Sequence, residues 1–188
     1  MGEIEMGRKD ALIIVDAQND FFPGGALEVP AGDEIVPVLN RLIDKAVAGG
    51  SMIVASRDWH PRGHVSFEAQ GGQWPPHCVA GTKGAEFHPD LRLPENVVVI
   101  TKGDRPDSDQ YSAFDRTGLA ELLRRAGVER LWVGGLAEDV CVFHTVKDAR
   151  KEGFEVHLIA DATRPVNVRE KDGLRAEEEM RAAGAIIE

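Results

Sequence analysis

The sequence predicts an α/β protein, a three-layer α/β/α sandwich around a central parallel sheet of five or six strands. Short apolar, β-branched segments recur along the chain, and segments with helical periodicity separate several of them. Strands that alternate with helices form right-handed crossovers, which place the strands in a parallel sheet and the helices on both of its faces.

The expected strands are short, continuous apolar segments, as is typical of strands buried on both faces. Five of them lie at Ala11–Val15, Met52–Ala55, Val97–Ile100, Leu131–Val133 and Val156–Ile159, and a sixth is expected at Ala185–Ile187.

Four helices are expected between or after these strands. They span Glu34–Ala48, Gly118–Ala126, Val140–Glu152 and Glu170–Ala183. The residues Asp33, Thr117 and Asp139 precede the first three, and Gly184 follows the fourth. Residues of these types commonly cap helix N-termini and C-termini, so we expect them to act as caps.

Two long segments, at residues 57–95 and 103–116, break the alternation of strands and helices. Both are polar and rich in Gly, Pro, His or Asp. Loops longer than ~12–15 residues in a compact domain are usually functional or disordered, so we interpret these two as active-site loops. A chain of 188 residues suits one domain, and we therefore expect a single domain over residues 1–188.

Composition limits the partners that this chain can have. The formal net charge of −10 would repel the phosphates of nucleic acid, so nucleic acid is an unsuitable partner. The segment Met1–Asp10 is polar, and no apolar stretch approaches the ~20 residues of a membrane span. We expect a cytoplasmic protein without a membrane partner, and the sequence leaves assembly into a homo-oligomer open.

The chain has two cysteines, Cys78 and Cys141. Two thiols do not form the disulfide framework of a small secreted domain, so we expect both to be reduced.

Reactive side chains collect where the predicted strands end. In parallel sheets, ligands bind outside the carboxyl ends of the strands, and one such edge should carry Asp16, Asp58, His60, Lys102 and Cys141. Each alone would be unremarkable at a strand end, but their joint placement indicates a catalytic or metal-binding site.

Cys141 follows a glycine-rich turn at the start of a predicted helix. Backbone N–H groups and the positive helix end favour a thiolate there, and a nearby Lys102 would lower the thiol pKa further. Asp16 could then accept and return the thiol proton in covalent catalysis, which makes Asp16, Lys102 and Cys141 a candidate triad. The alternative is that Cys141 is a buried cysteine that packs as a small hydrophobic residue.

The loop after the second strand carries Asp58 and His60, followed by His64 and His77. Carboxylate and imidazole ligands suit a divalent ion such as zinc, iron or manganese. The alternative is a polar loop whose histidines bond to the backbone. Cys78 could be an additional ligand, whereas the remaining histidines are interpreted as structural: His88, His144 and His157.

These residues lie in motifs that together resemble the nicotinamidase/pyrazinamidase branch of the isochorismatase-like cysteine hydrolases. The resemblance runs from about Ala11 to Ile187, in the family's order. The motifs are Val15-Asp16-Ala17-Gln18-Asn19-Asp20-Phe21, Arg57-Asp58-Trp59-His60-Pro61, Trp74-Pro75-Pro76-His77-Cys78, Lys102 with Tyr111-Ser112-Ala113-Phe114, and Gly135-Leu136-Ala137-Glu138-Asp139-Val140-Cys141.

The resemblance implies the isochorismatase-like hydrolase fold and hydrolysis of nicotinamide to nicotinate and ammonia, a step of NAD salvage, with pyrazinamide as a second substrate. It implies the triad Asp16, Lys102 and Cys141, and one divalent metal ion, zinc above all, on Asp58, His60 and His77. His64 is an optional further ligand.

The resemblance also implies residues that bind substrate. Phe21, Trp74, Tyr111 and Ala137 would line the pocket. A cis peptide before Ala137 would aim the backbone N–H groups of Ala137 and Cys141 at an oxyanion.

The sequence departs from the commonest family pattern at Ala17, where methionine is frequent, and at Val140, where tyrosine is frequent. These departures bear on pocket shape rather than on reaction class. Two rival functions remain: a cysteine hydrolase acting on another carboxamide or an N-carbamoyl compound, and a non-catalytic metal-binding protein with a buried Cys141.

Overall fold

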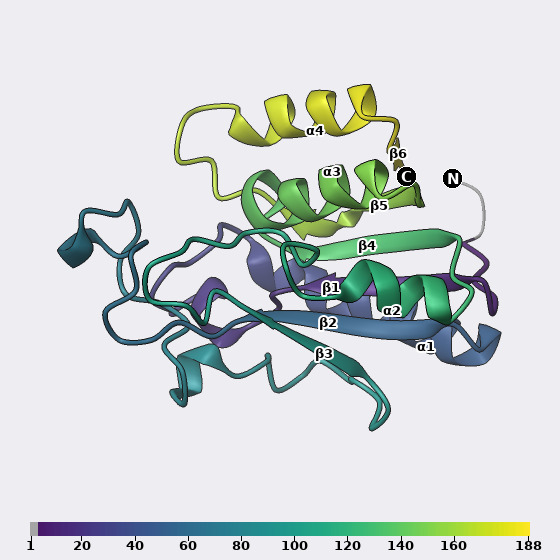
Figure 1. Cartoon of the computed structure of the whole chain (residues 1–188), viewed down its shortest axis with the longest axis horizontal. Coiled ribbons are helices and arrows are strands. Elements are labelled where there is room, and N and C mark those ends of the chain that lie inside the picture. The colour runs from purple at the N-terminus through teal and green to yellow at the C-terminus, as the bar shows by residue number, and fades with distance from the viewer. Residues whose placement is uncertain (1–3) are drawn as a thin grey trace.

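The computed structural model of the chain describes residues 4–188. It contains a six-stranded, wholly parallel sheet with the strand order β3-β2-β1-β4-β5-β6 (Figure 1). The strands are β1 (Asp10–Val15), β2 (Met52–Asp58), β3 (Val98–Lys102), β4 (Arg130–Leu136), β5 (Glu155–Arg164) and β6 (Ile186–Ile187). The predicted parallel sheet, its sixth strand included, is confirmed.

The helices are α1 (Ile35–Gly49), α2 (Leu119–Arg125), α3 (Phe143–Lys151) and α4 (Asp172–Ala182). The side chains of β1 alternate between the two faces of the sheet, and each face is covered by different helices. Leu12 and Ile14 pack with α1 on one face. Ala11 and Ile13 belong to the core on the other face, which α2, α3 and α4 cover. These two cores make the three predicted layers.

Two of the strands extend further than the apolar pattern predicted. β2 ends at Asp58 and β3 at Lys102, so these side chains are the last residues of neighbouring strands. Asp58 and Lys102 are direct partners in the strand register. Asp58 and Lys102 thus belong to the strands because they pair with a neighbouring strand, although the hydrophobic pattern had left them outside the expected strands.

The expected N-terminal caps are wrong for Asp33 and Asp139. Neither side chain bonds to the first turn of a helix: a 3₁₀ turn containing Asp33 precedes α1, and Asp139 lies within a π-helical turn, Glu138–Val142, that leads into α3. The Thr117 hydroxyl does accept the N–H of Leu119 at 3.3 Å, although Gly118 is the N-cap of α2. Gly184 has the expected left-handed conformation (φ +91°) after α4.

The first long loop contains the 3₁₀ turns Glu68–Gln70 and Lys83–Ala85 and isolated β-bridges that join His60 to Val79 and Phe67 to Trp74. Both loops begin at the carboxyl ends of β2 and β3, as expected of active-site loops. Within residues 4–188, no helix combines the length and apolar character needed to cross a bilayer.

Candidate active site

The Lys102 ammonium lies at the centre of a buried cluster formed by the ends of four strands. Nζ is 2.7 Å from Oδ2 of Asp16, 2.6 Å from Oδ1 of Asp58 and 3.3 Å from Sγ of Cys141. Lys102 and Asp16 are completely inaccessible to solvent. The three residues of the predicted triad therefore come together, and Asp58 joins them.

Asp16 leaves β1 in the left-handed region, with φ +47°. Its N–H is bonded to the carbonyl of Ser56, and its Oδ1 accepts the Ser56 hydroxyl at 2.7 Å. These bonds from β2 hold the carboxylate so that Oδ2 faces Lys102.

Gly135 allows β4 to approach β1 closely. It has φ +124°, and a Cβ at this position would lie 2.0 Å from the carbonyl oxygen of Val15. The backbone then passes through the cis peptide Leu136–Ala137, as expected from the family resemblance, into the turn that carries Cys141. This path brings Cys141 next to Asp16.

Burial determines the protonation of the cluster. Burial raises the pKa of the Cys141 thiol well above its ordinary value, and Lys102 opposes this effect only in part. This shift opposes the thiolate that the helix start and Lys102 were expected to favour. Burial also raises the pKa of Asp16, against the opposing effect of Lys102, which makes Asp16 a stronger base than an exposed carboxylate.

Asp58 differs from Asp16 in its protonation. Burial alone would raise the pKa of Asp58, but the Lys102 ammonium and the neighbouring imidazoles hold it below its usual range. Asp58 and Lys102 thus form a buried ion pair.

The predicted metal ligands Asp58, His60 and His77 are buried and offer donor atoms that lie within 4.8 Å of one another. Oδ2 of Asp58 is 3.4 Å from Nε2 of His60 and 3.9 Å from Nε2 of His77. This oxygen is the one that does not contact Lys102.

Backbone carbonyls orient both imidazoles. Nδ1 of His60 lies 2.8 Å from the carbonyl oxygen of Gly103, and Nδ1 of His77 lies 2.8 Å from that of Pro75. Such contacts fix the ring so that Nε2 is available as a ligand. Gly103 is also required sterically, since a Cβ there would lie 2.5 Å from the His60 ring. One carboxylate and two oriented imidazoles fit a divalent ion.

A second group of donors, on Asp16, Asp58 and Cys141, also lies within 4.8 Å. The Lys102 ammonium contacts all three, so the charge that a metal would supply is already present.

His64 lies next to the metal ligands but outside their group. Its ring centroid is 4.2 Å from that of His60. Its Nδ1 is 2.7 Å from the Ser66 hydroxyl, and its Nε2 is 3.3 Å from the carbonyl oxygen of Ser108. Both nitrogens of His64 thus have protein partners.

A cavity lies beside Cys141 and two of the metal ligands, Asp58 and His77. The four predicted substrate-binding residues, Phe21, Trp74, Tyr111 and Ala137, line it. Val140, whose departure from the family pattern was expected to bear on pocket shape, also lines it, together with three apolar residues that the sequence did not single out: Leu27, Val29 and Val166. Trp74 Nε1 donates to the Tyr111 hydroxyl at 3.2 Å. A cavity with apolar, partly aromatic walls and the polar groups Asp58, His77 and Cys141 beside them suits a small aromatic amide.

Sequence reasoning missed the role of Gln18, although it lies in a quoted motif. The buried Gln18 amide donates to the carbonyls of Asp58 (2.7 Å) and Ala85 (2.8 Å) and accepts the N–H of Asp58 (2.8 Å). Gln18 thereby holds the end of β2, from which Asp58 projects. Only its position two residues after Asp16 could have indicated this.

The other histidines lie outside the metal group. His88 packs on Phe22, and His157 lies between Glu155 and Glu188. His144 stacks on Tyr111 at the cavity mouth, with ring centroids 5.2 Å apart.

Comparisons with known proteins agree with this geometry. An isochorismatase domain model matches residues 10–187. The nicotinamidase of Escherichia coli is 43% identical over 94% of this chain and 93% of its own. The pyrazinamidase of Pyrococcus horikoshii, solved in complex with zinc, is 49% identical with a TM-score of 0.92, covering 96% of this chain and 98% of that one. An L. infantum protein solved in complex with nicotinate is 40% identical with a TM-score of 0.90, covering 98% of this chain and 95% of that one.

Proposed function

Because the chain belongs to the isochorismatase family, we propose that it is a nicotinamidase, a hydrolase that converts nicotinamide to nicotinate and ammonia and also accepts pyrazinamide. The observation that carries this proposal is the buried contact of Lys102 with Asp16, Asp58 and Cys141 at the floor of an aromatic-lined cavity.

In the mechanism, Asp16 accepts the thiol proton as Sγ of Cys141 attacks the carboxamide carbon. The raised pKa of both groups supports a thiol that loses its proton only as the S–C bond forms. Lys102 balances the negative charge that moves among Asp16, the sulfur and the substrate.

The tetrahedral intermediate then collapses. The C–N bond breaks, Asp16 returns its proton to the leaving nitrogen, and ammonia departs from a Cys141 thioester. Water, deprotonated by Asp16, attacks the thioester carbon; the C–S bond breaks, nicotinate is released, and Asp16 returns the proton to Sγ of Cys141. The backbone N–H groups of Ala137 and Cys141 are assigned to the oxyanion, because Ala137 lines the cavity next to the sulfur.

Asp58, His60 and His77 would hold the divalent ion, and zinc is the proposed ion. When bound, it supplies a Lewis-acid contact for the ring nitrogen. Asp58 and His77 line the cavity, which supports ring binding at that end. His64 is only an optional further ligand, since its Nε2 would have to leave the carbonyl oxygen of Ser108, whereas its Nδ1 could keep the Ser66 hydroxyl.

Ammonia release from nicotinamide by the purified protein tests the proposal, with Cys141→Ala as the matched inactive variant. We expect turnover by the metal-loaded wild-type protein and a large loss after chelation that added zinc restores. No release by metal-loaded protein would contradict the proposed activity.

The role of the metal is tested with benzamide, which has the same amide but lacks the ring nitrogen. A site built around a polar contact rejects an analogue that lacks it by up to roughly 10⁴–10⁵-fold. We expect benzamide to be a very poor substrate and pyrazinamide a competent one. Equal kcat/KM for benzamide and nicotinamide would show that the metal does not bind the ring nitrogen.

The rival within the same chemistry is hydrolysis of another carboxamide or an N-carbamoyl compound. The geometry of the catalytic cluster would serve either nicotinamide or such a substrate. Ammonia release measured on a substrate panel that includes N-carbamoyl amino acids decides between these two functions.

The chain is proposed to act as a single hydrolase domain over residues 1–188, in the cytoplasm. Both thiols are free, which suits a reducing compartment. Self-association is a further possibility that mass measurement in solution would test.

A further inference from the structure

Asp139 bonds to a segment that is distant in sequence and forms part of the cavity wall. Its Oδ1 accepts the N–H of Val166 and its Oδ2 accepts the N–H of Asn167, both at 2.8 Å. Asp139 lies in the turn of Cys141, whereas Val166 and Asn167 follow β5. One carboxylate thus joins the nucleophile's turn to another part of the chain.

The joined segment, residues 165–171, has no regular structure between β5 and α4. Its second half is fixed to α4: the Asn167 side chain accepts the N–H of Gly173 at 2.9 Å, and Asp172 accepts the N–H of Arg169 at 2.7 Å. The two hydrogen bonds from the backbone N–H groups of Val166 and Asn167 to Asp139 attach the first half of this segment to the turn that carries Cys141.

Val166 is the residue that this attachment places against the substrate cavity. It lines the cavity beside Cys141 and also the wider opening outside it, which contains His144 and Arg169. Val166 is half-buried and packs against the core on the α1 side of the sheet, whereas Val168 is 60% exposed, so apolar packing of this segment is incomplete. The two hydrogen bonds to Asp139 add to that partial packing in fixing the position of the wall.

We propose that Asp139 is a positioning residue that sets the width of the substrate cavity by holding Val166 in its wall, and that it thereby selects small, unsubstituted ring amides. The proposal rests on the amidase function proposed above. Hydrogen bonds to an ionised acceptor are roughly twice as strong as neutral ones, which suits a carboxylate in this role.

The first test is Asp139→Asn. An amide offers one acceptor oxygen and presents its NH₂ group to the second N–H, so the wall loses one of its two bonds. We expect KM for nicotinamide to rise about fivefold to tenfold while kcat changes less than about twofold, the pattern of lost binding rather than lost chemistry. The ratio of kcat/KM for a ring-methylated nicotinamide to that for nicotinamide should increase.

Alkylation of Cys141 by iodoacetamide gives a readout that does not depend on substrate. Its rate and pH profile should be unchanged in Asp139→Asn. A fall in kcat together with altered alkylation would mean that Asp139 acts on the nucleophile, and would overturn the proposal. If wild-type protein released no ammonia, the proposed function would fail instead.

Val166→Ala tests whether Asp139 acts through the wall. The alanine variant should itself raise KM and admit the methylated ring. The double variant should then show less than the product of the two single effects on kcat/KM, because both changes remove the same contact. Fully independent effects would contradict the proposal.

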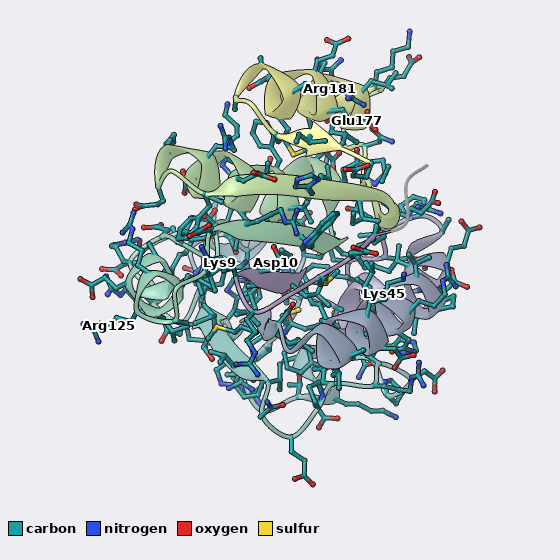
Figure 2. The ribbon with its side chains drawn as sticks, turned by 90° about the vertical axis from the view of Figure 1, so that its right-hand side faces the viewer. Lys9, Asp10, Lys45, Arg125, Glu177 and Arg181 are labelled. Atoms are coloured by element: carbon teal, nitrogen blue, oxygen red, sulfur yellow. The ribbon has the colours of Figure 1, made fainter. Side chains whose placement is uncertain are left out.

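Asp10→Asn is the matched control for a merely structural role. Asp10 is a buried carboxylate that accepts the N–H of Gly7 at 2.6 Å and pairs with Arg130, at the amino end of β1 (Figure 2). The Asp10→Asn variant should have a lower thermal stability, with the same KM for nicotinamide and the same preference between the methylated and unmethylated rings. If Asp139→Asn behaved in the same way, Asp139 would be structural and the proposal would be wrong.

Discussion

Lys102 and Asp58 form a buried ion pair, with 2.6 Å between Nζ and Oδ1, that joins the catalytic cluster to the proposed metal ligands. One oxygen of Asp58 faces the ammonium and the other faces the imidazoles. The two parts of the site share a carboxylate.

The first prediction concerns Lys102→Met. The change leaves Asp16 and Asp58 as two buried carboxylates without their cation, and removing one partner of a buried pair costs about 3–5 kcal/mol. We expect the free energy of unfolding of the metal-free protein, measured in urea, to fall by this amount. Iodoacetamide alkylation of Cys141 should also move to higher pH, because the group that lowers its pKa is gone. An unchanged alkylation profile would remove Lys102 from thiol activation.

Cys141→Ala should abolish ammonia release because it removes the nucleophile. It should leave metal content unchanged, because the sulfur contacts the Lys102 ammonium at 3.3 Å and is not one of the donors in the group Asp58, His60 and His77. Elemental analysis of the folded variant checks this, and lost metal would contradict it. Cys78→Ala is the matched control. Cys78 is buried in an apolar core cluster and is neither a nucleophile nor a member of the metal group, so the Cys78→Ala variant should retain most of the activity.

Asp16→Asn should lower kcat by about 10²–10⁴-fold, and it should also lower stability, because the amide NH₂ group would face the buried Lys102 ammonium that Oδ2 now contacts at 2.7 Å. The amide oxygen can still accept the Ser56 hydroxyl, and asparagine also tolerates the left-handed conformation at φ +47°. Ammonia release and thermal unfolding measure the two effects. A rate like that of the wild type would mean that another group takes the thiol proton.

Gln18→Leu should weaken zinc binding by about 10–100-fold, the usual effect of removing a residue that orients a metal ligand. It deletes three hydrogen bonds, two of them to the backbone of Asp58. Competition with a chromophoric chelator measures the affinity, and Gln70→Leu on the exposed loop is the control. Equal zinc affinity in both variants would show that Asp58 needs no such support.

Glu138 predicts a pH dependence of stability. Burial, followed by the nearby Glu177 and Asp139 carboxylates, raises the pKa of Glu138 to about 7, while Arg164 opposes the shift. Between its ordinary pKa and about 7 the folded state binds a proton that the unfolded state has lost, so this contribution to stability falls as pH rises through that range. Glu138→Gln, which mimics the neutral acid, should raise the melting temperature more at pH ~8 than at pH ~5. A larger gain at the lower pH would contradict the sign.

Most of the fold could be predicted because it depends on local patterns. Buried β-branched segments separated by helical periodicity indicate a parallel sheet, and a parallel sheet brings its carboxyl ends to one edge. That rule placed Asp16, Asp58, His60, Lys102 and Cys141 at one edge, and the loop after the second strand added His64 and His77 as candidate ligands. The family motifs then selected Asp58, His60 and His77 as the metal ligands and added the pocket residues.

Tertiary structure alone decided how these groups act on one another. Spacing along the chain does not show that Lys102 reaches both Asp16 and Asp58, that Ser66 and Ser108 bond to His64, or that Asp139 bonds to residues 166 and 167 instead of capping a helix. Nor does it give the burial that raises the pKa of Cys141. Hydrogen bonds and desolvation depend on distances between segments far apart in sequence, and packing sets those distances.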